Sequence, residues 1–331
     1  MPNVRIAMVG CGNMGSHHLD CMRKERTGLV PWAMVDMDGK KAEEACSKWG
    51  AKYYTTDYDR ALKDPDINAV MICTHHETHA RLCIEAAKCR KDIFVEKPLA
   101  LKLEECLDVE RTVKSTGVKF MIGYCERFST LSAMARELVP HPTITWGRQI
   151  DGRWPDDHWA QDPVTGGGNV FSQGCHTMDL IAWFNPSKPV RISAEGGTLT
   201  HKGTEVIDNI ISTITFENGS MAAAIIGDCG PGGLPKLSYE LIGEGKGAYI
   251  NNFYELWADT QKKDVKLRIF GGEGYVAGGW DYGVPQEQEA FAKYISEGGP
   301  SPVPVEDAIK ASIMILKAFE SIRTGKPYSL P

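Results

Sequence analysis

The sequence has no long run of charge of one sign and no apolar stretch of membrane-spanning length. Its formal net charge is −6, so the basic surface needed to bind nucleic acid or an anionic membrane is missing. No apolar run approaches the roughly 20 residues that cross a bilayer. The N-terminus also lacks the basic region and small-residue cleavage site of a secretion signal. We therefore expect a cytoplasmic protein with no nucleic-acid or membrane partner.

Closely spaced cysteine pairs are absent as well. The chain has ten cysteines, but no two of them have C-x-x-C spacing. Scattered thiols without a secretion signal are typical of reduced cytosolic proteins. The histidines of Thr74-His75-His76-Glu77-Thr78-His79 and of His17-His18 lie near a predicted strand end and glycine turn, where contacts other than zinc are favoured. We expect no disulfide framework and no metal.

The first third of the chain alternates short apolar runs with helical patterns. Strands are expected at 4–9, 29–36, 69–74, 93–96 and 119–124, and helices at 13–25, 39–49, 79–87 and 103–115. Strands separated by helices indicate a parallel, doubly wound sheet. With 331 residues, two domains are expected, and the first of them is α/β and spans 1–123.

After residue 124 the pattern becomes β-rich. A helix at 130–138 precedes strands at 143–150, 190–200, 208–216, 220–227, 236–242, 248–253 and 266–270, and helices at 286–297 and 305–324 end the chain. Turns such as Glu217-Asn218-Gly219-Ser220 between successive strands are typical of hairpins. The second domain, 124–331, is therefore expected to be α+β with a large, mostly antiparallel open sheet. Its final helix, 305–324, is expected to pack back against the first domain.

A glycine motif follows the first expected strand. Gly10-x-Gly12-x-x-Gly15, with Asn13 and Met14 in its second half, opens a helix. Such glycines allow a tight turn and a close approach of the backbone, so a pyrophosphate can lie at the helix N-terminus. Asp36 ends the second strand about 20 residues beyond the last glycine, where a carboxylate accepts hydrogen bonds from the adenosine ribose. These features predict dinucleotide binding and, because Asp36 repels a 2′-phosphate, NAD in preference to NADP.

Two further segments carry candidate chemistry. In Val95-Glu96-Lys97-Pro98-Leu99 an ionisable pair lies at the carboxyl end of a strand, the edge where open α/β sheets bind ligands. The second segment runs from Gly166-Gly167-Gly168 to Asp179 and is expected to begin a helix on which Ser172, His176 and Asp179 share one face. A histidine between a hydroxyl and a carboxylate is a candidate for proton transfer.

These motifs together resemble the glucose–fructose oxidoreductase / inositol dehydrogenase / MocA family of NAD(P)-dependent oxidoreductases. The resemblance covers nearly the whole chain. It rests on the glycine motif and on the following segments: Thr74 to His79, Glu96-Lys97-Pro98, Gly123-Tyr124-Cys125-Glu126-Arg127-Phe128, Gly166-Gly167-Gly168, Gly174-Cys175-His176, Asp179-Leu180 and 321–327. It implies a Rossmann domain followed by a domain whose open sheet mediates assembly into a homo-oligomer, a dimer or a tetramer.

The resemblance also implies the roles of individual residues. Lys97 and His176 would be the catalytic pair. The expected cofactor contacts are Gly10, Gly12, Asn13, Met14, Gly15, Asp36, Thr74, His75, His76, His79, Glu96 and Lys97. The expected substrate contacts are Lys97, Tyr124, Arg127, Trp154, Asp157, His158, Ser172, Gln173, His176 and Asp179.

A sugar or cyclitol is the favoured substrate. Aromatic rings and carboxylates, which suit the C–H faces and hydroxyls of a sugar, cluster at 154–159 and in Trp280-Asp281-Tyr282. In a dehydrogenase, His176 would take the hydroxyl proton while Lys97 stabilises charge on the oxygen. Three alternatives remain open: an NADPH-dependent ketoreductase, a redox-assisted glycosidase that retains NAD, and a non-catalytic regulator that binds dinucleotide.

The chain departs from the family pattern at two places. Thr74-His75-His76 stands where the family often has Thr-Pro-Asn, and Ser172 stands where it often has aspartate. The first departure bears on contacts to the cofactor or substrate. The second puts the usual lysine–aspartate–histidine set in doubt.

Overall fold

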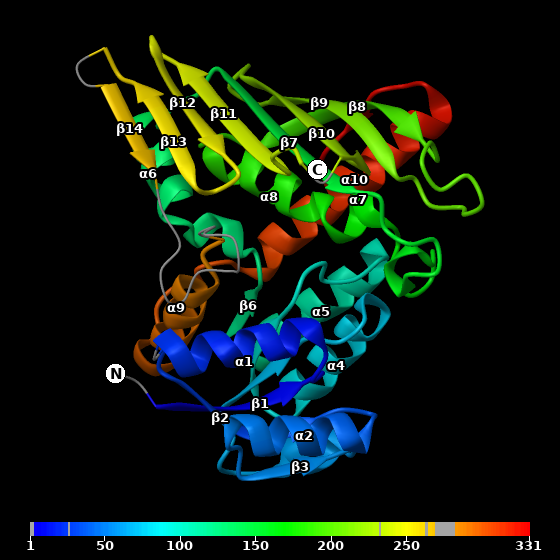
Figure 1. Ribbon diagram of the computed structural model, residues 1–331, viewed down its shortest axis with the longest axis vertical. Helices are drawn as coiled ribbons and strands as arrows, with labels where there is room; N and C mark the ends of the chain where they lie inside the picture. Colours follow the sequence, from blue (N-terminus) through cyan, green and yellow to red (C-terminus); the bar gives the residue numbers. More distant parts are fainter. Residues whose placement is uncertain (1–2, 26, 232, 262–263, 269–281) are drawn as a thin grey trace. The chain divides into compact units, whose positions relative to one another are not determined.

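The computed structural model describes residues 3–25, 27–231, 233–261, 264–268 and 282–331. The chain forms two compact units (Figure 1). One consists of Met1–Cys125 and Val284–Ile309, and the other of Glu126–Gly283 and Lys310–Pro331. The domain limits predicted from the sequence, 1–123 and 124–331, and the predicted packing of the last helix remain predictions.

The first unit contains a parallel sheet with the strand order β3-β2-β1-β4-β5-β6 among its described residues. Its strands are β1 (Val4–Val9), β2 (Leu29–Val35), β3 (Tyr53–Thr55), β4 (Ala69–Ile72), β5 (Asp92–Val95) and β6 (Phe120–Ile122). Every residue of β4 and β6 is buried, as expected for strands covered on both faces by helices. The predicted doubly wound parallel sheet is confirmed.

Helices connect these strands. They are α1 (Asn13–Glu25), α2 (Gly39–Trp49), α3 (Tyr58–Lys63), α4 (His76–Lys88) and α5 (Leu103–Thr116). A further helix of this unit, α9 (Val284–Glu297), comes later in the chain, after β14. Local signals place their ends: Asp38 accepts two backbone N–H bonds at the start of α2, and Gly50, with φ 74°, ends it. The short elements β3 and α3 carry no clear periodic signal in the sequence and were not predicted.

The second unit is built on a sheet with the order β14-β13-β12-β11-β7-β10-β9-β8-β15 among the residues described. Its strands are β7 (Ile144–Gly152), β8 (Pro189–Gly197), β9 (Asn209–Phe216), β10 (Met221–Gly230), β11 (Leu237–Gly243), β12 (Lys246–Asn251), β13 (Glu255–Asp259), β14 (Asp264–Arg268) and β15 (Tyr328–Ser329). Neighbouring strands are antiparallel except β7 and β10, which are parallel. The predicted α+β domain with a mostly antiparallel sheet is confirmed. Residues 269 and 270 of the predicted last strand lie outside the described residues.

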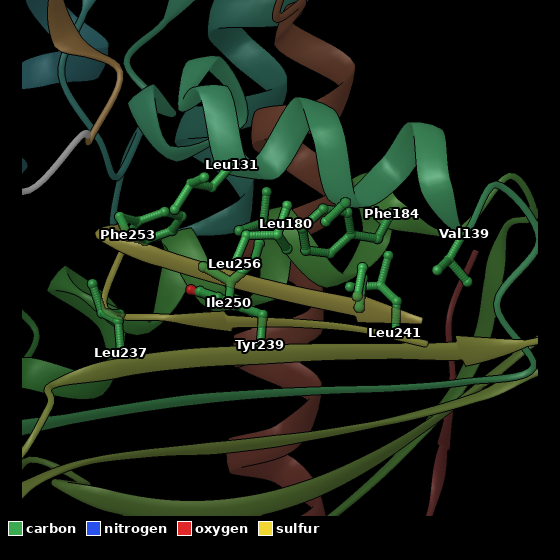
Figure 2. Close-up of a cluster of buried hydrophobic side chains, with 13 residues drawn as sticks. Leu131, Val139, Leu180, Phe184, Leu237, Tyr239, Leu241, Ile250, Phe253 and Leu256 are labelled. Carbon is green, nitrogen blue, oxygen red and sulfur yellow. The ribbon is translucent and has the colours of Figure 1, made fainter. Parts of the chain in front are cut away.

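Helices lie against one face of this sheet (Figure 1). They are α6 (Thr130–Leu138), α7 (Asn169–Ser172) and α8 (Gly174–Phe184). The unit also contains η2 (Trp159–Gln161), η1 (Cys125–Phe128) from Glu126 onward, and α10 (Val305–Thr324) from Lys310 onward. Figure 2 shows the core that forms where α6 and α8 meet β11, β12 and β13. Leu131 and Phe184 come from the helices and Tyr239, Ile250 and Leu256 from the strands, and all are almost fully buried. In the described part of the chain, no helix is long and apolar enough to span a membrane.

The opposite face of the sheet carries exposed and half-exposed side chains. In β7, β9 and β10 buried and more exposed residues alternate along each strand, as in a sheet packed on one side only. Trp146, Glu240, Tyr249 and Trp257 occupy matching register positions on four adjacent strands, so they form a row across this outer face. The large apolar residues exposed on it include Ile144, Ile211, Met221, Ile242 and Trp257.

Candidate active site

In the glycine loop between β1 and α1, some glycines are needed for packing and another leaves space for a ligand. A Cβ added at Gly10, whose φ is 93°, would lie 2.5 Å from the carbonyl oxygen of Cys73. A Cβ at Gly15 would lie 2.0 Å from the carbonyl oxygen of Gly10. Both positions therefore require glycine for the fold itself. A Cβ at Gly12 would meet no described atom within 4 Å, so this glycine leaves open the space that a pyrophosphate needs beside the backbone.

Asp36 closes this loop from the next strand. Its Oδ2 accepts the N–H of Cys11 at 2.8 Å, and its Oδ1 accepts the N–H of Asp38 at 2.9 Å. Each carboxylate oxygen has a second acceptor site, so the ribose hydroxyls of a dinucleotide still have partners here. Burial, followed by the charge of Asp36, raises the pKa of the Cys11 thiol to about 12, so this thiol stays protonated at neutral pH. The loop residues fit the pyrophosphate and adenosine ribose of NAD.

The histidines after β4 have different environments. His75 is exposed immediately before α4, and His76 is buried in its first turn. His79 is fully buried, and its Nδ1 lies 2.8 Å from the carbonyl oxygen of Pro98 while its Nε2 lies 3.1 Å from that of Thr74. Burial lowers the pKa of His79, although these two bonds oppose the shift. A neutral His79 ring has one N–H and so donates to one of these two carbonyls, and its predicted contact with the cofactor remains a prediction.

Lys97 lies near the carboxyl end of β5 (Asp92–Val95), with Glu96 between the strand and the lysine. Its backbone N–H donates to Oε2 of Glu96 at 3.1 Å, and Oε1 of Glu96 lies 2.7 Å from Nε2 of His18. The sequence indicates only that His18 is an unlikely metal ligand. Its contact with Glu96 is not predicted, because the two residues are 78 positions apart in the chain. Among the residues the structure describes, no group of three His, Cys, Asp or Glu side chains could hold a metal ion.

His176 lies in the second unit. The predicted single helix is instead two, α7 and α8, which meet at Gln173, and the N–H of His176 donates to the carbonyl of Gln173 at 3.0 Å. Ser172 ends α7, His176 lies in the first turn of α8, and both are buried. The break occurs where Gly174 packs closely on the sheet, since a Cβ there would lie 2.9 Å from the side chain of Ile226.

The glycines before α7 are also explained by packing. A Cβ at Gly166 would lie 2.2 Å from Cα of Ala160, and one at Gly168 would lie 2.8 Å from Cβ of Val206. This glycine run lets the loop before α7 lie directly against other parts of its own unit.

Asp179, expected beside His176, forms an ion pair with Arg127. The Arg127 guanidinium donates through Nε at 2.7 Å and through a terminal nitrogen at 2.5 Å to the two carboxylate oxygens of Asp179. Both side chains are buried. Such a two-point pair joins η1 to α8 and balances the buried carboxylate with a fixed positive charge. The substrate contacts predicted for both residues remain predictions.

A polar cluster not found from the sequence adjoins Gln173. Lys236 at the start of β11 forms an ion pair with Asp151 of β7 at 2.6 Å, and Asp151 also accepts from the Asn169 amide at 3.0 Å. The Lys236 ammonium lies 3.5 Å from Oε1 of Gln173, and the Gln149 amide donates to the same oxygen at 3.3 Å. Asp151 and Lys236 are 85 positions apart in the sequence, so no local pattern connects them. The cluster offers donors and acceptors that suit hydroxyl groups.

The predicted substrate residues near 154–158 lie on a loop. The rings of Trp154 and His158 are 5.0 Å apart, and Nδ1 of His158 accepts the N–H of Ala160. Asp157 is exposed on the same loop. Tyr124, also predicted to contact substrate, is fully buried in the first unit. Of the other aromatic candidates, Trp280 and Asp281 lie outside the described residues.

These features define a class of protein: a two-domain oxidoreductase with an NAD-binding Rossmann domain. Comparison with known proteins places the chain within that class. Residues 4–124 match a family described as oxidoreductase family, NAD-binding Rossmann fold, and residues 143–249 match the GFO/IDH/MocA C-terminal domain. The chain belongs to the glucose–fructose oxidoreductase / inositol dehydrogenase / MocA family, and the resemblance seen in its sequence is confirmed.

Individual relatives are distant. The chain is 25% identical over 332 residues to the uncharacterized oxidoreductase YrbE of Bacillus subtilis, covering 98% of this chain and 95% of that protein. It is 28% identical to scyllo-inositol 2-dehydrogenase (NAD(+)) of the same organism, over 66% of this chain and 65% of that one. Levoglucosan dehydrogenase in complex with NADH and L-sorbose has the same fold, with a TM-score of 0.87, 22% identity and full coverage of both chains.

Proposed function

We propose that this protein is an NAD-dependent dehydrogenase that transfers a hydride between the nicotinamide and a secondary alcohol or ketone of a sugar, cyclitol or related compound. The observation that carries the proposal is the family match to both domains, because the second match includes His176. Relatives named for inositol and levoglucosan dehydrogenation support the substrate class. The polar cluster of Asp151, Lys236 and Gln173 supports a substrate rich in hydroxyls.

The proposed chemistry divides between two side chains. Bound NAD supplies the acceptor for the hydride. His176 takes the hydroxyl proton on a ring nitrogen, which is general-base catalysis. Lys97 donates a hydrogen bond to the substrate oxygen and stabilises its developing negative charge. The remaining proposed substrate contacts are Tyr124, Arg127, Trp154, Asp157, His158, Ser172, Gln173 and Asp179.

Assembly and location are part of the same proposal. A homo-oligomer formed through the outer face of the nine-stranded sheet would cover Ile144, Ile211, Met221 and Trp257, which are exposed in a single chain. A cytoplasmic location is supported by scattered cysteines such as Cys83, whose burial raises the pKa of its thiol and leaves it unreactive.

Alanine variants of the catalytic pair test the proposed mechanism. Lys97→Ala and His176→Ala should each lower turnover by about 10²- to 10⁴-fold, as for lost general acid–base catalysis. The substrate is first identified by screening sugars, cyclitols and sugar acids for NAD reduction, and NAD affinity is measured by calorimetry. His176→Ala should leave NAD affinity nearly unchanged, since His176 acts on the substrate.

Two exposed residues give matched controls. Lys102→Ala and His141→Ala remove the same side chains from exposed positions and should retain native turnover. Native turnover in either catalytic variant would show that its residue is not catalytic. Product formation without stoichiometric NADH would show a reaction in which the cofactor is restored within each cycle.

A further inference from the structure

Buried hydrogen bonds in the first unit connect Gln288 of α9 to His18 of α1, and His18 to Glu96, the residue before Lys97. His18 of α1 and Gln288 of α9 have no exposed surface, and Glu96 is 5% exposed. Phe94 lies in β5 and Glu96 follows its last residue, with the N–H of Glu96 still bonded to Ile72 of β4, so the two side chains point to the same side of the sheet. The Phe94 ring lies 5.4 Å from the ring of His18 and 5.5 Å from that of Phe291, which places α1 and α9 on that side.

The hydrogen bonds determine which nitrogen of His18 carries a proton. Nε2 of Gln288 lies 2.9 Å from Nδ1 of His18 and 3.1 Å from the carbonyl oxygen of His18. A carbonyl only accepts, so the amide must present its NH₂ group to both atoms. Nδ1 of His18 is then an acceptor without a proton. Its Nε2 carries the proton and donates to Glu96 at 2.7 Å.

The Glu96 carboxylate connects His18 to the backbone of Lys97. Oε1 of its carboxylate accepts from His18, and Oε2 accepts the backbone N–H of Lys97 at 3.1 Å. Gly123 lies beside this carboxylate, and a Cβ there would lie 3.3 Å from Oε1, so glycine leaves space for the carboxylate in this position. Bonds at both carboxylate oxygens therefore hold the peptide group on the N-terminal side of Lys97.

The other side of Lys97 is held by a second buried histidine. Nδ1 of His79 lies 2.8 Å from the carbonyl oxygen of Pro98, the residue after Lys97. The electrostatic interactions of Cys73, directly after β4, involve Glu96, Cys11 of the glycine loop and Glu287 on α9, and those of His79 on α4 involve Glu96 and Lys97. His18 and Gln288 connect the region by hydrogen bonds to α1 and α9.

We propose that His18, with its proton held on Nε2 by Gln288, is a positioning residue for Lys97. It acts through Glu96 and fixes the direction in which the chain leaves β5. The proposal rests on the proposed function, in which Lys97 stabilises charge on the substrate oxygen. A lysine displaced by about 1 Å would bind substrate nearly as well but would stabilise the transition state poorly.

Kinetics of two His18 variants test this role. His18→Leu removes the donor to Glu96, and kcat should fall about 10- to 100-fold, with KM and the Kd of NAD changing by less than about 3-fold. His18→Gln places an amide N–H near the position of Nε2 and should recover most of the lost kcat. His17→Leu makes the same replacement one position earlier on α1 and should leave kcat at the wild-type value.

Gln288 provides a second, independent test. Gln288→Leu removes the donor to Nδ1 and should lower kcat without a matching change in KM. Long-range ¹H–¹⁵N spectra of ¹⁵N-histidine protein report the protonated ring nitrogen directly. The His18 ring should carry its proton on Nε2 in the wild type and should show a mixture of both forms in Gln288→Leu.

The outcomes separate this inference from the function on which it rests. Wild-type kcat in folded His18→Leu, or a proton on Nδ1 of wild-type His18, would overturn the positioning role. If His18→Leu does not fold, wild-type kcat in Gln288→Leu would overturn it instead. Native activity of Lys97→Ala would reject the catalytic role of Lys97 itself, whereas an inactive Lys97→Ala beside a fully active His18→Leu would reject only the positioning role.

Discussion

Single residues decide how the first unit can hold its cofactor. The carboxylate of Asp36 accepts two backbone N–H groups and keeps lone pairs for ribose hydroxyls. Gly12 is different from Gly10 and Gly15, because only at Gly12 does an added Cβ find no described neighbour within 4 Å. Binding and folding therefore depend on different members of one short motif.

Replacing Asp36 should change the choice between NAD and NADP. The wild type should bind NAD more tightly, since the carboxylate repels a 2′-phosphate. Asp36→Ala should weaken NAD by about 10- to 150-fold, equivalent to a lost charge-assisted bond of ~1.5–3 kcal/mol, and should weaken NADP less. The ratio of the two Kd values is the measurement, because the loss of the Cys11 and Asp38 bonds affects both cofactors. A wild type that prefers NADP, or an unchanged ratio, contradicts this role.

Ser172 is the residue at which the chain departs from its family. Ser172→Asp would add a negative charge shortly before His176, and a negative charge stabilises the protonated imidazole. A base must be deprotonated to act, so the acidic limb of kcat/KM for alcohol oxidation should move to higher pH, by about one unit if the groups lie within ~4–6 Å. The profiles of both proteins are compared with the same substrate. A limb that moves to lower pH contradicts the charge argument, and an inactive variant would indicate that serine leaves room for the substrate.

At the scale of elements, a buried histidine joins three segments of the second unit. Nδ1 of His201 lies 2.6 Å from Asp156 in the loop before η2, and its Nε2 lies 2.6 Å from Asp228 of β10. The Gln161 amide of η2 donates to the same Asp228 oxygen at 2.9 Å. Burial alone would lower the pKa of His201, but its bonds to the two carboxylates outweigh burial and raise it. Burial also raises the pKa of Asp228.

These shifts predict a pH-dependent stability. A histidine whose folded pKa lies above its unfolded value of 6.5 stabilises the fold fully below that pH, and the contribution is lost as pH rises through the folded pKa. The raised pKa of Asp228 acts in the same direction. His201→Gln should therefore lower the urea midpoint of the second unit more at pH 6 than at pH 8.5 (conditions chosen on either side of roughly pH 6.5–7). A larger loss at pH 8.5 would show that His201 is not held as an imidazolium.

At the scale of the molecule, the outer face of the nine-stranded sheet exposes aromatic and aliphatic side chains of the second unit. Trp146 and Tyr249 have ring centroids 6.2 Å apart, and Tyr249 and Trp257 are 6.5 Å apart, so aromatic rings run across adjacent strands. Ile211 and Met221 are more than half exposed on neighbouring strands. An exposed aromatic and aliphatic surface of this kind is typical of subunit interfaces.

Charged substitutions on this face should change the oligomeric state. Ile211→Lys together with Met221→Lys places two charges in the proposed interface and should convert the oligomer to smaller species in light scattering after size exclusion. Leu199→Lys is the matched control, because Leu199 is 62% exposed but lies outside the strands of the sheet. A wild-type monomer, or an oligomer that survives the double substitution, contradicts assembly through this face.

Much of this protein is determined by its sequence alone. The Rossmann sheet, the glycine loop, the carboxylate of Asp36 and the place of Lys97 at a strand end are all predicted from neighbouring residues, because strand period, turn chemistry and helix starts are local properties. The antiparallel character of the second sheet follows from its hairpin turns for the same reason. The helix break at Gln173 was not predicted, since it depends on how closely Gly174 approaches Ile226.

Only the tertiary structure decided which distant residues pair with one another. Helical spacing predicts that Asp179 shares a face with His176, but it gives no sign of the ion pair that Asp179 forms with Arg127, 52 positions away. Gln288 reaches His18 across 270 positions, and β7 lies parallel to β10, which no turn in the sequence indicates. A buried polar group takes whichever complementary group the packing of distant elements brings within about 3 Å. The pairing of buried polar groups therefore depends on which strands and helices become neighbours, and local sequence patterns do not predict it.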